Sequence, residues 1–285
     1  MRKLGLHLRL DTSLVDLVKK AKDLEIDFFQ CFLTQKTEGR ILPLDSQDIE
    51  DFVELRRESF KDSYLHISYW VNLSSVKNNE HRLLAKELAL VKKLEFTHIV
   101  IHPGSAKGEK RLSKGIDALA GMINSLIKNG PDSSSESANG KNFTFVIENV
   151  AQKFPCIGGD ISHFRLLLEK LDNPDKIKFC IDTAHAFSYG YDLADFKKQD
   201  EFVDFIDSQV GLNRVCLIHL NDNIGACGSH IDTHCALGEG KIGLEALKRF
   251  AQQPKLQNIP VLLEPPMMSD EQLRKELELV RSWIK

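Results

Sequence analysis

The chain has 285 residues, of which 42% are hydrophobic and 28% are charged, and its formal net charge is −3. This length and balance suit one large α/β barrel or two small domains, and the mildly acidic charge does not favour a nucleic-acid binder. No apolar run is long enough to span a bilayer, and the N-terminus lacks the features of a secretory signal peptide. The six scattered cysteines form no Cys-x-x-Cys pair, as is typical of reduced thiols in a cytosolic protein.

Short apolar runs alternate along the chain with segments whose apolar residues recur at helical spacing. The runs are Leu4–Leu8, Phe28–Leu33, Tyr64–Ile67, His98–Ile101, Phe143–Ile147, Phe179–Ile181, Val215–Ile218 and Val261–Leu263. Several helical segments start at suitable N-caps, such as Thr12 or Ser13 and Ser269. Eight alternations predict one (β/α)8 TIM barrel, a single domain over residues 1–285. Residues 129–142, rich in Ser, Asn and Gly, are predicted to form a flexible surface loop.

Near the C-terminal end of each of the last six runs lies a residue that can bind a metal ion. These residues are His66, His102, Glu148, Asp182, His219 and Glu264. His185 follows Asp182 by three positions, and Asp232 and His234 lie in the segment after the seventh run. Because the C-terminal ends of barrel strands converge on the face that carries the active site, we expect all nine side chains to point into one pocket.

A cluster of imidazoles and carboxylates without nearby Lys or Arg is costly unless cations neutralise it. This mixture of ligands suits zinc and, less exclusively, manganese or iron. Nine ligands are too many for one tetrahedral site, but with one bridging carboxylate they fit three metal ions. His7 ends the first run and is expected to face the same pocket without binding metal.

Longer motifs surround these residues. They read His-x-Ser-Tyr-x-x-Asn-Leu from His66, His-Pro-Gly-Ser from His102, Glu-Asn from Glu148, Asp-Thr-Ala-His-Ala-Phe from Asp182, Gly-Tyr-Asp from Gly190, His-Leu-Asn-Asp from His219, Asp-x-His from Asp232, Gly-Glu-Gly from Gly238 and Glu-x-Pro from Glu264. With them the chain resembles the endonuclease IV family, zinc-dependent apurinic/apyrimidinic endonucleases built on a xylose-isomerase-like barrel. The motifs are long, ordered and spread over the whole barrel, so the resemblance is specific.

The resemblance implies three zinc ions at the barrel mouth. The implied ligands are His66, His102 and Glu148 for the first zinc, Glu148 as a bridge with Asp182, His219 and Glu264 for the second, and His185, Asp232 and His234 for the third. Manganese or iron in place of some of the zinc stays open.

The resemblance also implies DNA base-excision repair. The reaction would be hydrolysis of the phosphodiester 5′ to an abasic site in double-stranded DNA, leaving a 3′-hydroxyl and a 5′-deoxyribose phosphate. Glu148 would bridge the two zincs that supply the attacking hydroxide, and the third zinc would stabilise the departing 3′-oxyanion. Three zinc ions and one hydroxide would add about five positive charges at the DNA-binding face. We expect a cytoplasmic monomer, at the bacterial nucleoid or its equivalent.

The expected DNA contacts are Tyr69, Trp70, Arg40 and His7, and here the sequence departs from the family. The family carries an Arg-and-aromatic segment after strand two, whereas residues 34–40 contain Arg40 but no aromatic residue. Trp70 stands where the family has an aliphatic residue, and it offers a larger stacking surface. The family's Asp-Arg-His motif has Thr233 in the middle, which removes a cation. These changes predict an altered grip on DNA with the metal chemistry intact.

The main alternative is a divalent-metal sugar isomerase or epimerase on the same barrel. Such enzymes resemble this chain at Glu148, Asp182, His219 and Glu264, which can hold one or two Mn²⁺ or Mg²⁺ ions. They have no need for the remaining histidines or for Asp232. A second alternative, a non-catalytic DNA-binding relative, would leave buried ligands without use, at a cost in stability.

Overall fold

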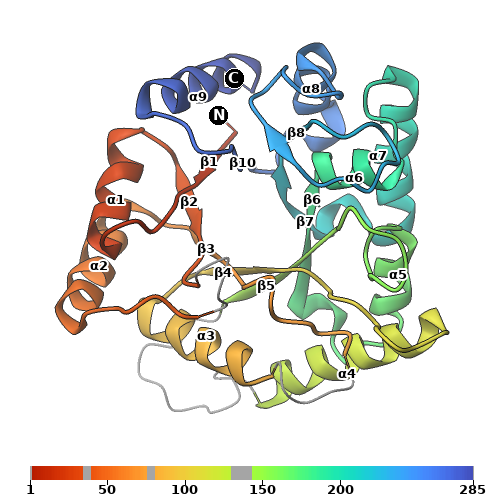
Figure 1. Cartoon of the computed structure of the whole chain (residues 1–285), viewed down its shortest axis with the longest axis horizontal. Coiled ribbons are helices and arrows are strands. Elements are labelled where there is room, and N and C mark those ends of the chain that lie inside the picture. The colour runs from red at the N-terminus through yellow and green to blue at the C-terminus, as the bar shows by residue number, and fades with distance from the viewer. Residues whose placement is uncertain (1, 35–39, 76–80, 130–142, 285) are drawn as a thin grey trace.

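The computed structural model describes residues 2–34, 40–75, 81–129 and 143–284, and it contains a closed barrel of parallel strands surrounded by helices (Figure 1). The order around the barrel is β1-β10-β7-β6-β5-β4-β3-β2. Consecutive barrel strands therefore pair with one another, and the last strand returns to the first, with Leu263 paired to Leu6. The predicted (β/α)8 barrel is confirmed.

The eight barrel strands correspond to the eight predicted runs. They are β1 (Leu4–His7), β2 (Phe28–Cys31), β3 (Ser63–His66), β4 (His98–Ile101), β5 (Thr144–Glu148), β6 (Ile177–Asp182), β7 (Val215–His219) and β10 (Val261–Leu263). A small antiparallel sheet of β8 (Asp222–Asn223) and β9 (His234–Cys235) lies in the segment that follows β7.

Helices follow the barrel strands. They are α1 (Leu14–Asp23), α2 (Ser46–Ser59), α3 (His81–Leu94), α4 (Leu112–Asn129), α5 (Ser162–Leu168), α6 (Thr183–Tyr189), α7 (Phe196–Val210), α8 (Leu244–Ala251) and α9 (Asp270–Trp283). Asn129, predicted to open a loop, is instead the last residue of α4, and residues 130–142 lie outside the described part of the chain. No helix in the described ranges is long and apolar enough to cross a membrane.

The predicted N-caps show why two of these helices begin where they do. The Ser13 hydroxyl accepts a hydrogen bond from the Asp16 backbone N at 3.0 Å and so satisfies an otherwise unpaired amide at the start of α1. Ser269 and Gln272 form a capping box at the start of α9, in which each side chain bonds to the other residue's backbone N–H.

The interior of the barrel is built in two layers, and the lower layer is apolar. Phe28, Tyr64, Val100, Val146, Cys180, Leu217 and Leu262, one from each of seven strands, form a single buried cluster. The eighth strand contributes Gly5, where an added Cβ would come within 2.5 Å of the Phe28 ring. Glycine is required there because the ring fills that space.

The upper layer is polar and lies two residues further along every strand. Its members are His7, Gln30, His66, His102, Glu148, Asp182, His219 and Glu264. Residues i and i+2 of a strand point to the same side, so the apolar layer fixes this polar ring above it, at the C-terminal end of the barrel. Six of the nine predicted metal ligands therefore share one level of the barrel.

Candidate metal centre

The Asp-x-x-His motif is the junction between β6 and α6. Asp182 ends the strand and caps the helix, because its Oδ1 accepts a hydrogen bond from the His185 backbone N at 2.7 Å. The strand aims the Asp182 side chain into the barrel, and the first turn of α6 brings His185 to the same region. The three-residue spacing between Asp182 and His185 therefore lets Asp182 cap α6 and also brings both side chains to the same site.

The motifs that follow β3 and β4 are joined by Asn72. Its Oδ1 accepts a hydrogen bond from the Ser105 backbone N at 2.8 Å, and its Nδ2 donates to the Ser105 carbonyl at 2.8 Å. Gly104 has φ +90°, and an added Cβ would lie 2.1 Å from Asn72 Oδ1. The two loops are therefore held together directly behind His66 and His102.

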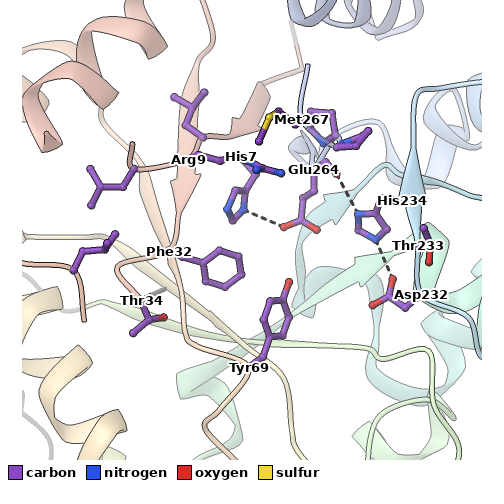
Figure 2. Close-up of a pocket in the computed structure, with 15 residues that line it drawn as sticks. His7, Arg9, Phe32, Thr34, Tyr69, Asp232, Thr233, His234, Glu264 and Met267 are labelled. Carbon is purple, nitrogen blue, oxygen red and sulfur yellow. Dashed lines mark hydrogen bonds and ion pairs between the residues drawn. The ribbon is translucent and has the colours of Figure 1, made fainter. Parts of the chain in front are cut away.

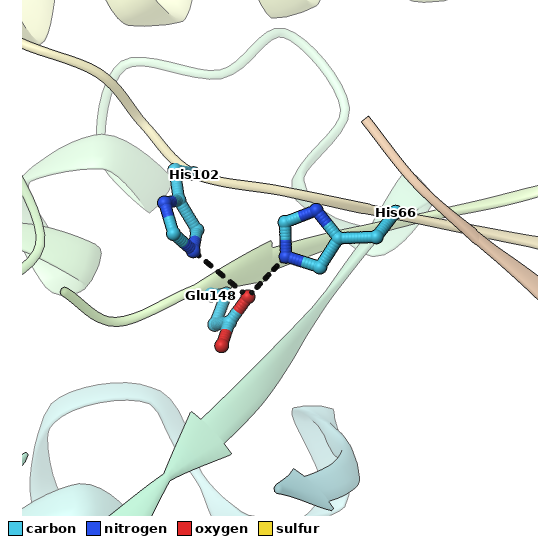
Figure 3. A group of neighbouring side chains, drawn as sticks. All are labelled: His66, His102 and Glu148. Atoms are coloured by element: carbon cyan, nitrogen blue, oxygen red, sulfur yellow. Dashed lines mark hydrogen bonds and ion pairs between the residues drawn. The ribbon is translucent and has the colours of Figure 1, made fainter. Parts of the chain in front are cut away.

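One group of ligand-type side chains consists of His66, His102 and Glu148 (Figure 3). His66 Nε2 lies 2.9 Å and His102 Nε2 lies 3.1 Å from the same oxygen, Glu148 Oε2. These residues come from the ends of β3, β4 and β5. Their ligand atoms all lie within 4.8 Å of one another, close enough to share a metal ion.

A second group shares Glu148 with the first. Glu148 Oε1 lies 2.9 Å from His219 Nδ1, and Glu264 Oε2 and Asp182 Oδ2 lie 3.3 and 3.8 Å from that nitrogen. Asn221 secures the group, since its Nδ2 donates to Asp182 Oδ2 at 2.6 Å. The two oxygens of Glu148 thus face different groups, which is the geometry that a bridging ligand needs.

The third group lies beyond the ring of strand ends. His185 Nε2 is 3.2 Å from Asp232 Oδ2, and His234 Nε2 is 3.3 Å from Asp232 Oδ1. Asp182 Oδ2 also approaches His234 Nε2, at 3.9 Å. The set within 4.8 Å is Asp182, His185 and His234, so Asp182 stands between the second and third groups. The structure therefore brings the nine side chains together at the mouth of the barrel.

Each of four histidines has one ring nitrogen held by a backbone carbonyl or by the Gln30 amide, which leaves the other nitrogen facing the carboxylates. The contacts are His66 Nδ1 with Ile67 O at 2.9 Å, His185 Nδ1 with Asn149 O at 2.8 Å, His234 Nδ1 with Glu264 O at 3.1 Å and His219 Nε2 with Gln30 Oε1 at 3.2 Å. This is how metal-binding histidines are usually oriented. His234 Nε2 is buried, and within the described chain it faces the Asp232 carboxylate, whose Oδ1 lies 3.3 Å away.

The charges in the cluster favour a bound cation. Burial alone would lower the pKa of His219, but the Glu264 and Glu148 carboxylates outweigh burial and raise it to about 9. Burial lowers the pKa of His234 too, but the hydrogen bond with Asp232 and the charges of Asp182 and Glu264 together outweigh burial and raise it to about 9. Among the described residues, no lysine or arginine forms an ion pair with Glu148, Asp232 or Glu264. Protonated imidazoles therefore supply the positive charge that metal ions would replace.

A cavity of about 610 Å³ opens beside the cluster (Figure 2). Its polar wall includes His7, Asp232, His234 and Glu264, and its other walls include Arg9, Phe32, Tyr69, Pro265, Pro266 and Met267. His7 faces this cavity as predicted, and its Nδ1 lies 3.2 Å from Glu264 Oε1. The volume is in the range of small-ligand sites.

The other predicted DNA-contact residues are Tyr69, Trp70 and Arg40, and all three are exposed. Tyr69 lines the cavity, and 49% of its surface and 56% of that of Trp70 is exposed. Arg40 is exposed and lies just before Ile41, whose backbone pairs with Thr34. Residues 35–39 of the same segment lie outside the described part of the chain.

Gln30 belongs to the polar ring, although no sequence motif identifies it. Its side chain contacts His7, His219 and Glu264. An amide has no ionisable group, and this one lies inside the apolar run Phe28–Leu33, whose pattern predicts core. A signal was present in the sequence, since a glutamine inside a buried parallel strand is unusual.

Comparison with known proteins agrees with this geometry. Residues 18–283 match the family model described as "Xylose isomerase-like TIM barrel". A protein of Methanosphaera stadtmanae named "Probable endonuclease 4" is 30% identical and is covered over 99% of both chains. One of the same name from Thermosipho melanesiensis is 31% identical, with 93% of each chain covered. The crystal structure of endonuclease IV from Thermus thermophilus superposes with a TM-score of 0.81 at 29% identity, covering 99% of this chain and 98% of that one. With the nine side chains at the mouth of its barrel, the chain belongs to the endonuclease IV family of xylose isomerase-like barrels.

Proposed function

We propose that this protein is a zinc-dependent endonuclease that hydrolyses the DNA phosphodiester 5′ to abasic sites, leaving a 3′-hydroxyl and a 5′-deoxyribose phosphate. The observation that carries the proposal is the arrangement of three ligand groups around Glu148 and Asp182 beside an open cavity. A sugar isomerase or epimerase would need only the group formed by Glu148, Asp182, His219 and Glu264. The additional histidine groups favour a phosphodiesterase.

The donor set fits three zinc ions, with the ligands divided as the family resemblance implies. Zinc bound there would supply a water of lowered pKa as nucleophile and positive charge for the phosphate. Glu148 would be a ligand shared by the first and second ions. His185, His234 and Asp232 would hold the third, and two of them, His234 and Asp232, line the cavity. Manganese or iron would suit some of the same ligands.

The cavity would receive the baseless sugar and its phosphate. Phe32, Tyr69 and Met267 give it apolar walls, while His7 and His234 lie on its polar side. Tyr69 and Trp70, exposed at the rim, would stack against the neighbouring bases and fill the space left by the missing base. Arg40, which is also exposed, would contact the DNA backbone.

Incision of a labelled duplex that carries one tetrahydrofuran abasic analogue tests the proposal. The analogue cannot undergo β-elimination, so a nick requires hydrolysis. We expect no nick with metal-stripped protein and a nick with a polymerase-extendable 3′-hydroxyl after zinc is restored. An intact duplex under both conditions would contradict the proposal, and metal-dependent turnover of a ketose or aldose would then support the isomerase alternative.

A further inference from the structure

We propose that Gln30 is a positioning residue of the metal centre, which determines the atoms that His219 and Glu264 present to the second metal ion. The inference rests on the proposed metal cluster and adds a residue that carries no metal itself. Gln30 is fully buried on β2, in the polar ring of the barrel, between His7 of β1 and the residues of β3.

The orientation of the Gln30 amide follows from its neighbours. Gln30 Nε2 lies 2.6 Å from Glu264 Oε1, and a carboxylate oxygen can only accept, so the amide nitrogen must be the donor. The carbonyl oxygen of the same amide then faces His219, with Oε1 at 3.2 Å from His219 Nε2. The contacts leave only this orientation of the amide.

This orientation fixes the tautomer of His219. Because Gln30 Oε1 is an acceptor without hydrogen, His219 Nε2 must carry the proton and donate it. The lone pair available to a metal is therefore on Nδ1, the nitrogen that faces Glu148, Glu264 and Asp182. Donation from the second ring nitrogen to a fixed acceptor also holds the plane of the ring.

The same amide selects one oxygen of Glu264. Oε1 is occupied by the Gln30 Nε2 hydrogen bond and lies near His7 Nδ1 at 3.2 Å. Oε2 is the oxygen on the His219 side, 3.3 Å from His219 Nδ1, and it also accepts from Asn221 Nδ2 at 3.3 Å. The Gln30 amide thus orients His219 Nδ1 and Glu264 Oε2 so that these two atoms face each other.

A hydrophobic residue could fill position 30 of the strand, but it could not make the hydrogen bonds that orient His219 and Glu264. It would leave His219 Nε2–H without an acceptor in the closed interior and would remove the hydrogen bond that Gln30 donates to Glu264 Oε1. An unmade buried hydrogen bond leaves the donor without its partner, so the His219 ring would be driven to other tautomers or orientations. The loss should therefore appear in metal binding at one site.

The test is zinc binding by the full-length protein, measured as zinc content after dialysis and as dissociation constants from chelator competition. We expect wild type to bind three zinc ions. Gln30→Met, which keeps the length and removes the amide, should weaken one of the three by about 10- to 100-fold and leave the other two unchanged. Gln30→Asn, which keeps the amide but withdraws it from reach, should weaken the same ion.

Gln199→Met is the matched control. Gln199 is also buried, and its amide bonds to the Leu193 and Ala246 carbonyls and to Arg249, away from the cluster. This variant should lose thermal stability but keep all three zinc affinities. The NMR spectrum of cadmium-substituted protein gives a second readout, in which one of three metal resonances should shift or disappear in both Gln30 variants only.

The outcomes separate the two proposals. Wild type that binds no zinc overturns the proposed metal cluster and this inference with it. Three zinc ions in wild type, with unchanged affinities and cadmium spectra in both Gln30 variants, overturn the role of Gln30 alone. A uniform loss of all three ions in the Gln30 variants also overturns it, because that result shows a general effect on the fold.

Discussion

Substitution of Glu87 by glutamine should make the protein more stable at alkaline pH. Glu87 lies on α3 beneath the segment that carries Tyr69 and Trp70, and its side chain is fully buried. Its two oxygens lie 3.3 Å from the Ser68 backbone N, and Thr34 Oγ1 lies 3.5 Å from Oε1. Burial outweighs these hydrogen bonds and raises the pKa of Glu87 from 4.5 to about 7.

The magnitude and the sign follow from that pKa. Between about pH 4.5 and pH 7 the folded state holds a proton on Glu87 that the unfolded state has lost, so the free energy of unfolding falls as pH rises through this window. The loss is complete above about pH 7 and amounts to roughly 3 kcal/mol, at about 1.4 kcal/mol per pKa unit. Glutamine keeps an acceptor for the Ser68 N–H and has no charge to bury. The variant should therefore gain up to about 3 kcal/mol over wild type above pH 7 and nothing below pH 4.5.

Urea unfolding of wild type and Glu87→Gln across this pH range measures the difference. Both proteins are compared in the same buffers, so effects of pH that they share cancel. Glu58→Gln, an exposed position on α2, is the control and should show no such dependence. A difference in unfolding free energy that is constant with pH, or a variant that is less stable at alkaline pH, would refute the reasoning, because it would mean that Glu87 is ionised and well solvated in the fold.

Other perturbations test the site itself. His102→Ala and Asp182→Ala should abolish incision of the tetrahydrofuran duplex by zinc-loaded protein. The control is His163→Ala, at a buried histidine outside the cluster, which should retain incision. Incision by the His102 or Asp182 variant would show that the substituted residue does not belong to the site. Trp70→Ala should weaken binding to abasic duplex by about 1–3 kcal/mol in a titration and weaken binding to intact duplex less, and equal losses on both would show that the ring only packs. Gly104→Ala should lower the free energy of unfolding by about 1–3 kcal/mol, since φ is +90° there; a variant as stable as wild type would show that the loop adjusts without strain.

The location of most of the site could be predicted because strand ends are visible in a sequence. An apolar run followed by His, Asp or Glu marks where a buried strand reaches the barrel face, and closure of the barrel brings all such ends together. This reasoning succeeded for His66, His102, Glu148 and His219 without any knowledge of register. It did not reveal that Asp182 lies between two ligand groups, since that depends on where α6 and the segment after β8 place His185 and His234.

Asn129 and Gln30 show the limits of this approach. The Asn and Gly residues that follow Asn129 predict a loop there, but Asn129 completes the last turn of α4. Gln30 stands in the apolar run Phe28–Leu33, and no predicted ligand motif includes it. Its part in the polar ring is visible only when the alternation along β2 is aligned with that of the other seven strands.

The sequence by itself determined the barrel, the chemistry of the ligands and the end of the barrel at which they gather, because periodicity and residue type are local properties. The tertiary structure decided which atom of each side chain in the cluster faces which neighbour. The two oxygens of Glu148 divide between two groups, and Gln30 assigns the ring nitrogens of His219, because these roles depend on contacts between strands that are up to 189 residues apart in the chain. Such contacts are fixed by the register and closure of the barrel, and no short stretch of sequence carries that information.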